Sequence, residues 1–357
     1  MADNKSPFSN LTKIMDPRRF FGRAVEKQSI FNQLAAANPQ SVAILGERRI
    51  GRSSLLVHIE QTYERALPQP ERYHFGYLDL TRDTVRTPEQ FYAQMARALF
   101  QTDYKTLEPA EFDDLLDAHN EDGRKCFVLL LDEFNVLQRR RDQFGDDFYD
   151  GLRSRANEPT VAYVLATHLP LSEIALQNQF TSTFFGIFYT VRLGNLSRDE
   201  ARELVLQPGD RPLTEADFAE IESWVEREYH PLKLNMAANL IWHKWPYPPY
   251  RELEADFRVA LGDVFGTAVT QERAKRQRQA SFFGVLRWVQ RWPEYWFGAE
   301  HRYKLLIVIG VVLLLVFGVV TGADLLDVSG LLPDPTPTST AIPATPTVIP
   351  PTSTPIP

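Results

Sequence analysis

The stretch Ser41–Val57 reads SVAILGERRIGRSSLLV and decides the fold. Its apolar run, Val42–Leu45, predicts a buried strand that ends at Gly46. Four residues separate Gly46 from Gly51, and an apolar helical pattern begins just after Gly51. A glycine-bounded loop of this kind turns successive backbone N–H groups toward one point, above the positive end of the helix dipole. The stretch therefore predicts a strand, a phosphate-binding loop and the first turn of a helix.

The spacing fits the phosphate-loop pattern G-x-x-x-x-G-K-[ST], with Arg52 in place of the lysine. Arg52 keeps the positive charge but replaces a compact ammonium with a planar fork, so the two side chains are not equivalent. Ser53 stands where a Mg²⁺ ligand is expected. The predicted phosphate-binding residues are Gly46, Glu47, Arg48, Arg49, Ile50, Gly51, Arg52, Ser53 and Ser54. The alternative is a strand-to-helix turn that binds no ligand.

A second motif, Cys126–Phe134 or CFVLLLDEF, favours the ligand-binding interpretation. Its apolar run followed by two acids predicts a buried parallel strand with carboxylates at its carboxyl end, where ligands of open α/β sheets bind. Asp132 is the expected Mg²⁺ ligand, and Glu133 is the expected catalytic base that activates water. Taken alone, the motif also fits a core strand followed by solvated acids.

Strands and helices alternate along the first half of the chain, which predicts an α/β fold with a parallel sheet between helices. Further strands are expected at residues 73–80, 161–167 and 185–193, and helices at 24–37, 52–66, 87–100, 109–119 and within 143–157. From Leu196 the pattern becomes all-helical, beginning with the capping-box sequence Ser197–Glu200. A small helical lid module is therefore expected after the sheet, with helices ending near residue 206, at 214–228, from 230 to about 242, and at 251–267.

Composition limits the class of partner and the compartment. The chain has 357 residues, a formal net charge of -7 and one cysteine, Cys126. The acidic balance argues against nucleic acid as the main partner. A single cysteine inside an apolar strand allows no disulfide framework, which suits a reducing compartment for the folded part.

The segment Leu305–Ala323 is 19 residues long and carries no charge. At about 1.5 Å per residue a helix of this length matches the hydrocarbon core of a bilayer. Arginine and lysine gather before it and are absent after it, so we expect one span with the N-terminal part cytoplasmic and the tail outside the plasma (inner) membrane. A buried core helix is the alternative.

The chain thus divides into six expected parts. They are a lead-in (1–16), an α/β ATPase domain (17–195), a helical lid (196–270), a basic and aromatic juxtamembrane segment (271–303), a transmembrane helix (304–323) and a Pro/Thr-rich disordered tail (324–357).

Residues 17–245 resemble bacterial P-loop ATPases of the AAA+/STAND group. The resemblance rests on the motifs FGR, GERRIGRSSLL, VLLLDEF, LATH and LGNLSRDEARELV, and on His230-Pro231. It implies that Phe21, Gly22 and Arg23 border the adenine. It also implies that Thr167 is a sensor beside the γ-phosphate and that His230 brings the lid toward the nucleotide.

These observations predict a membrane-anchored regulatory switch that binds ATP/ADP with Mg²⁺, hydrolyses ATP slowly and acts on an unidentified protein. One alternative is an oligomeric remodelling ATPase, for which Arg139–Arg141 are candidate arginine fingers, and a homo-oligomer stays open. A scaffold that binds nucleotide without hydrolysis is another, favoured by Arg52 but opposed by the intact Asp132-Glu133 pair. A DNA-associated ATPase shares the early motifs, but the acidic balance and the membrane span argue against it.

Overall fold

The computed structural model describes residues 6–8, 12–209 and 211–266. All of them fall in the first of two compact units, Met1–Gln271. A five-stranded sheet forms its centre, with the strand order β2-β3-β4-β1-β5 and parallel pairing throughout. The strands are β1 (Val42–Gly46), β2 (Tyr73–Asp79), β3 (Cys126–Asp132), β4 (Val161–Thr167) and β5 (Tyr189–Leu193). The predicted parallel sheet is confirmed.

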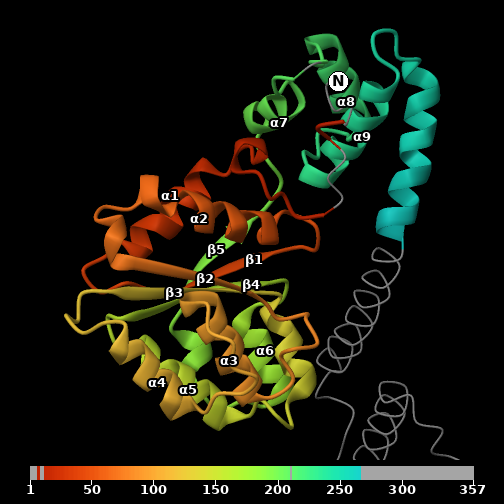
Figure 1. The fold of residues 1–357 in the computed structure, drawn as a ribbon. Helices are drawn as coiled ribbons and strands as arrows, with labels where there is room; N and C mark the ends of the chain where they lie inside the picture. The colour runs from red at the N-terminus through yellow and green to blue at the C-terminus, as the bar shows by residue number, and fades with distance from the viewer. Residues whose placement is uncertain (1–5, 9–11, 210, 267–357) are drawn as a thin grey trace, which may run out of the picture. The chain divides into compact units, whose positions relative to one another are not determined.

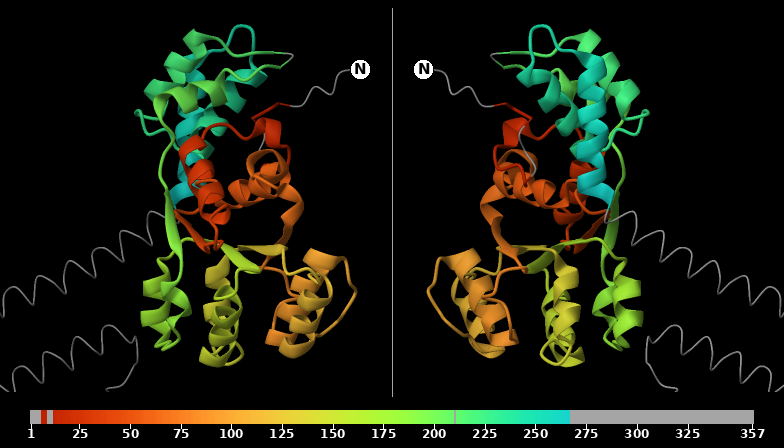
Figure 2. Two further views of the ribbon diagram at one scale, coloured as in Figure 1. Left: turned by 90° about the vertical axis from the view of Figure 1, so that its left-hand side faces the viewer. Right: turned by 90° about the vertical axis from the view of Figure 1, so that its right-hand side faces the viewer.

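Helices cover both faces of this sheet (Figures 1 and 2). One face carries α1 (Ala24–Leu34) and α2 (Arg52–Ala66). The other carries α3 (Pro88–Phe100), α4 (Pro109–Ala118), α5 (Asp146–Ala156) and α6 (Leu171–Asn178). Side chains alternate along each strand, so each face has its own apolar core. Leu130 and Val164 belong to the core under α1 and α2, and Leu129 and Leu165 to the opposite one.

The expected elements differ from the structure most clearly at four places, one of which is α1, since it ends at Leu34 and not at residue 37. The last strand begins at Tyr189 and not at residue 185, because Thr183–Gly186 form a 3₁₀ turn whose Phe184 and Phe185 pack into the core. Helix α6 was not expected. Helix α8 (Glu215–Trp224) ends before residue 228, since Glu226 and Arg227 have the left-handed φ values 55° and 60°.

The remaining described helices form a helical module, made of α7 (Arg198–Val205), α8, α9 (Pro231–His243) and the helical residues 250–266. Apolar side chains from all four helices, including Phe218, Ile241 and Phe257, share one core. The capping box predicted at Ser197 is present, because its hydroxyl accepts from the N–H of Glu200, whose carboxylate accepts in return from the N–H of Ser197.

The expected juxtamembrane segment, the span at 304–323 and the tail lie outside the described residues. Within the ranges that the structure describes, no helix has both the length and the apolar character needed to cross a membrane.

Candidate nucleotide-binding site

The phosphate loop has the predicted form. Strand β1 ends at Gly46, and α2 begins at Arg52 after the loop. Gly51 caps α2 with φ at 106°, a conformation that only glycine adopts without strain. Arg49 also lies in the left-handed region, with φ at 66°, so the loop curls tightly over the N-terminus of α2.

A cleft of about 370 Å³ opens beside this loop, a volume within the usual range for small-molecule sites. The predicted site residues that line it are Phe21, Arg23, Arg49, Ile50, Gly51, Arg52, Ser53, Ser54, Asp132 and Glu133. The helical module supplies Leu196, Leu204, Pro231, Leu232 and Asn235 to the opposite wall. The cleft therefore lies between the sheet and the module.

The predicted residues outside this lining are Gly22, Gly46, Glu47, Arg48, Thr167 and His230. Gly46 still takes part in the site, because its carbonyl oxygen accepts a hydrogen bond from the Arg52 guanidinium. Glu47 and Arg48 lie exposed on the loop. Their predicted roles stay predictions.

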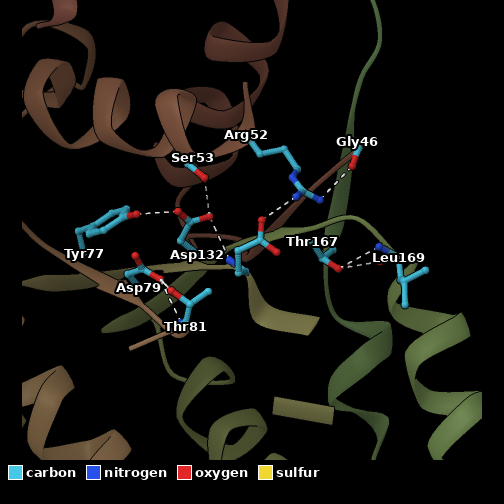
Figure 3. A network of polar contacts seen from close by, with 10 residues as sticks. Gly46, Arg52, Ser53, Tyr77, Asp79, Thr81, Asp132, Thr167 and Leu169 are labelled. Atoms are coloured by element: carbon cyan, nitrogen blue, oxygen red, sulfur yellow. Dashed lines mark hydrogen bonds and ion pairs between the residues drawn. The ribbon is translucent and has the colours of Figure 1, made fainter. Parts of the chain in front are cut away.

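Arg52 is buried, with 4 % of its side chain exposed, and both ends of its guanidinium are engaged (Figure 3). Nη1 donates to the Gly46 carbonyl at 2.9 Å, and Nη2 donates to Glu133 Oε1 at 2.8 Å. Burial lowers the pKa of Arg52, and the Glu133 and Asp132 carboxylates oppose that shift. Arg52, the cation expected to bind the phosphates, is thus paired with Glu133, the expected catalytic base.

Asp132 is held from three directions at the end of β3 (Figure 3). Its Oδ1 accepts from Ser53 Oγ and from the Glu133 N–H, both at 3.0 Å. Its Oδ2 accepts from the Tyr77 hydroxyl at 2.6 Å. Burial and the charge of Asp132 raise the pKa of Tyr77, so this hydroxyl keeps its proton and donates.

A hydroxyl and a carboxylate meeting at one point suit Mg²⁺, which takes a few protein oxygens and completes its shell with water and substrate phosphates. Ser53 and Asp132 would hold the ion, and its chemistry there would be to neutralise charge on the β- and γ-phosphates. In the described part of the chain, no group of three or more His, Cys, Asp or Glu side chains is arranged so that it could hold a metal ion, and a site of this kind needs none.

Three residues near Asp132 were missed by sequence reasoning. Asp79 ends β2 directly opposite Asp132 in the strand register, and its carboxylate accepts from the N–H and hydroxyl of Thr81. Tyr77 precedes it on the same strand. Lys13 reaches the Tyr77 hydroxyl at 3.1 Å from a segment that the sequence marks only as a lead-in. The sequence did contain a signal for Asp79, because this acid ends a strand pattern as Asp132 does.

The segment expected to border the adenine connects the loop with the module. Arg23 is buried, and its guanidinium donates to the carbonyls of Gly194 at 2.6 Å and Ile50 at 3.4 Å. Its backbone N–H donates to Glu200 Oε1 at 2.5 Å. Gly22 has φ at 73°, and a Cβ there would lie 2.9 Å from the same oxygen. Glycine is needed here for both conformation and space.

Two predicted sensors are engaged locally. The Thr167 hydroxyl donates to the Leu169 carbonyl at 2.9 Å and accepts from the Leu169 N–H at 3.2 Å. His230 caps α9, since its Nδ1 accepts from the Leu232 N–H at 3.2 Å. Burial, helped by the charges of Lys233 and Arg23, lowers the pKa of His230 to about 4, so the ring is neutral near pH 7.

Together these features define a class. A parallel sheet, a phosphate loop at the start of α2 and an Asp-Glu pair at the end of β3 make a P-loop ATPase domain of the AAA+/STAND kind. The chain belongs to the family described as Novel STAND NTPase 2 (nSTAND2), whose profile matches residues 36–226, more than half of the sequence. A search among curated proteins found no match.

Solved structures share the fold at low sequence identity. The Walker-type ATPase paby2304 of Pyrococcus abyssi has a TM-score of 0.55 and 17% identity, with 76% of this chain and 81% of that chain covered. The ORC2 protein of Aeropyrum pernix, in ADPNP-ADP complexes, has a TM-score of 0.54 and 12% identity, with 71% of each chain covered. P-loop ATPases in general bind nucleotide and Mg²⁺.

Proposed function

We propose that this protein is a membrane-anchored regulatory switch that binds Mg²⁺-ATP, hydrolyses it slowly and transmits the state of the nucleotide through the helical module. The observation that carries the proposal is the position of the cleft, whose walls come from the phosphate loop on one side and from α9 on the other. A ligand in such a cleft contacts both parts, so its loss changes the contacts between them.

Slow turnover follows from the pairing of Arg52 with Glu133. A γ-phosphate and Glu133 are both anions, so a phosphate at the loop competes with Glu133 for the charge of Arg52. A carboxylate paired with a cation is a weaker base, so Glu133 activates water better once Arg52 releases it. Hydrolysis then requires a rearrangement before the chemical step, which lowers its rate.

The Arg23 segment supplies the connection to the module. Arg23 holds the loop through the Ile50 carbonyl and holds α7 through Glu200, which also forms the capping box of that helix. Nucleotide binding against Phe21 and Arg23 therefore acts on the first turn of α7. A displacement of the module relative to the sheet is the expected output.

The membrane part of the proposal rests on the sequence alone. The uncharged run Leu305–Ala323 and the basic residues before it favour a single-pass protein of the plasma (inner) membrane, with the ATPase domain cytoplasmic. The anchor would keep the protein at the membrane, where an unidentified protein partner responds to the module.

The ion pair also favours a second candidate, a scaffold that binds nucleotide and does not hydrolyse it. If Arg52 never releases Glu133, bound ATP persists as a structural ligand. Measured turnover separates the two functions.

Distances between two labels would test the switch. Cys126 is the only cysteine and is buried, so Val25→Cys on α1 and Ala219→Cys on α8 give exposed sites for spin labels. We expect the distance distribution of the full-length chain in detergent to differ between Mg²⁺-ATPγS and Mg²⁺-ADP. Identical distributions in both nucleotides and without nucleotide would contradict the switch.

A further inference from the structure

Residues 12–14 lie along the cleft and are fixed to the sheet domain. All three line the cleft. The Ile14 N–H donates to Ser54 Oγ at 3.0 Å, one residue beyond the expected metal ligand Ser53. Upstream, Phe8 is buried in the core of the helical module, 2 % exposed. The N-terminal segment therefore contacts both walls of the cleft.

Lys13 carries a cation into this site. Its ammonium donates to the Tyr77 hydroxyl at 3.1 Å and lies 4.5 Å from the centre of the Tyr77 ring. Tyr77 in turn donates to Asp132 Oδ2 at 2.6 Å. Within the described residues, no ion pair joins Lys13 to a carboxylate, although its charge opposes the burial that raises the pKa of Glu60. Lys13 is also the only described lysine that lines the cleft, so a ligand there would meet its charge.

Arg52, the buried cation of the phosphate loop, already has protein partners. It donates to Gly46 and to Glu133, so it turns to a phosphate only when it leaves Glu133. Lysine differs from arginine in presenting a compact charge with rotatable donors on a flexible stem. A lysine linked to Asp132 through the Tyr77 hydroxyl suits the phosphate oxygens of a nucleoside triphosphate.

We propose that the Lys13 ammonium binds the terminal phosphate of ATP and that Tyr77 is the residue that positions it. Lys13 lies outside the phosphate loop and supplies the ammonium that the loop lacks. This inference rests on the proposed nucleotide site and adds a residue to it. Because the γ-phosphate is the group that ADP lacks, Lys13 gives the site its preference for the triphosphate.

The test compares Lys13→Ala with the control Lys105→Ala, which removes an exposed lysine far from the cleft lining. Equilibrium titrations of the full-length chain in detergent measure Kd for Mg²⁺-ATPγS and for Mg²⁺-ADP. Losing a charge-assisted hydrogen bond predicts a rise of about tenfold or more in Kd for ATPγS with Lys13→Ala. Kd for ADP changes by less than about threefold, and Lys105→Ala changes neither.

A double-mutant cycle separates charge from structure. Replacing Arg52 by lysine returns an ammonium to the loop, so Lys13→Ala weakens ATPγS binding much less in the Arg52→Lys background than in the wild type. Tyr77→Phe keeps the ring and removes the hydroxyl, and it lowers the preference for ATPγS over ADP in the same direction as Lys13→Ala.

The results that overturn the proposal differ from those that overturn the nucleotide site. Wild-type protein that binds neither nucleotide refutes both. Wild-type binding that Lys13→Ala leaves unchanged refutes the role of Lys13 alone. If Lys13→Ala weakens the binding of ATPγS and ADP equally, and by the same factor in both Arg52 backgrounds, the segment has a structural role. This result also refutes the role of Lys13.

Discussion

Arg52 Nη2 lies 2.8 Å from Glu133 Oε1, across 81 positions of sequence. The two residues that the motifs assign to phosphate binding and to water activation neutralise each other in this structure. Glu133 meets Arg52 from a left-handed backbone conformation, with φ at 52° and ψ at 44°, which costs about 1 kcal/mol for a residue with a side chain. A phosphate that takes Arg52 away would free Glu133, so nucleotide binding and activation of the base are coupled.

Removing the metal ligands should weaken the Mg²⁺-dependent part of nucleotide binding. Ser53→Ala removes the hydroxyl oxygen, and Asp132→Ala removes the carboxylate whose Oδ1 lies 3.0 Å from it. We expect a rise of about tenfold in Kd for ATP with Mg²⁺ and a smaller change in EDTA, since a charged ligand contact contributes roughly 1.5–3 kcal/mol. Ser154→Ala, an exposed serine on α5, is the control. Unchanged Mg²⁺ dependence in both variants would remove the metal assignment.

Glu133→Gln should separate binding from turnover. The neutral amide no longer pairs with Arg52 as an ion, so the guanidinium is freer to bind phosphate, and we expect ATP affinity to rise by about threefold, or roughly 0.6 kcal/mol. Turnover should fall by about 100-fold, the usual contribution of a general base. Kinetics beside Glu121→Gln, which neutralises an exposed carboxylate, check this. Turnover equal to that of the wild type would show that Glu133 is not the base.

Stability should fall between pH 7 and pH 5 partly through His230. Its pKa is lowered from 6.5 to about 4 in the folded chain, so the unfolded state binds more protons in this window and stability rises with pH. The loss from pH 7 to pH 5 is about 2 kcal/mol for this group. Glu222, whose pKa is lowered to about 2, acts only below this window.

The variant His230→Asn tests that assignment, because asparagine also caps helices but does not titrate. Denaturant unfolding at several pH values should give a flatter profile for the variant than for the wild type. His58, whose burial lowers its pKa to about 4, contributes the same slope to both proteins. Parallel profiles would mean that His230 does not titrate on unfolding.

Deleting residues 304–323 should move the protein from the membrane to the soluble fraction. The segment removed contains the uncharged run that predicts the span. Deleting 334–353, a stretch of the same length within the Pro/Thr-rich tail, should leave the protein on the membrane. Sedimentation of both variants with membranes would indicate that the aromatic residues before the run are a sufficient anchor.

The sequence predicted the strand ends and the loop between β1 and α2 wherever a single local pattern encodes them. The apolar runs before Gly46 and Asp132, each ending abruptly, placed the phosphate loop and the acidic pair at the carboxyl edge of one sheet. Contacts that depend on the strand register were not predictable in the same way. Lys13 and Tyr77 are 64 positions apart, and neither belongs to a motif. The pairing of Arg52 with Glu133 likewise depends on how far each side chain extends across the sheet edge.

The rate of ATP hydrolysis by this chain, compared with that of Arg52→Lys, shows whether the ion pair with Glu133 restrains turnover. Lysine lacks the planar fork that contacts Gly46 and Glu133 together, so it should release the base. We expect the wild type to bind Mg²⁺-ATP and hydrolyse it slowly, and Arg52→Lys to hydrolyse it at least about tenfold faster, a barrier change of roughly 1.4 kcal/mol. Turnover that stays the same or falls in Arg52→Lys, with binding intact, would contradict this restraint.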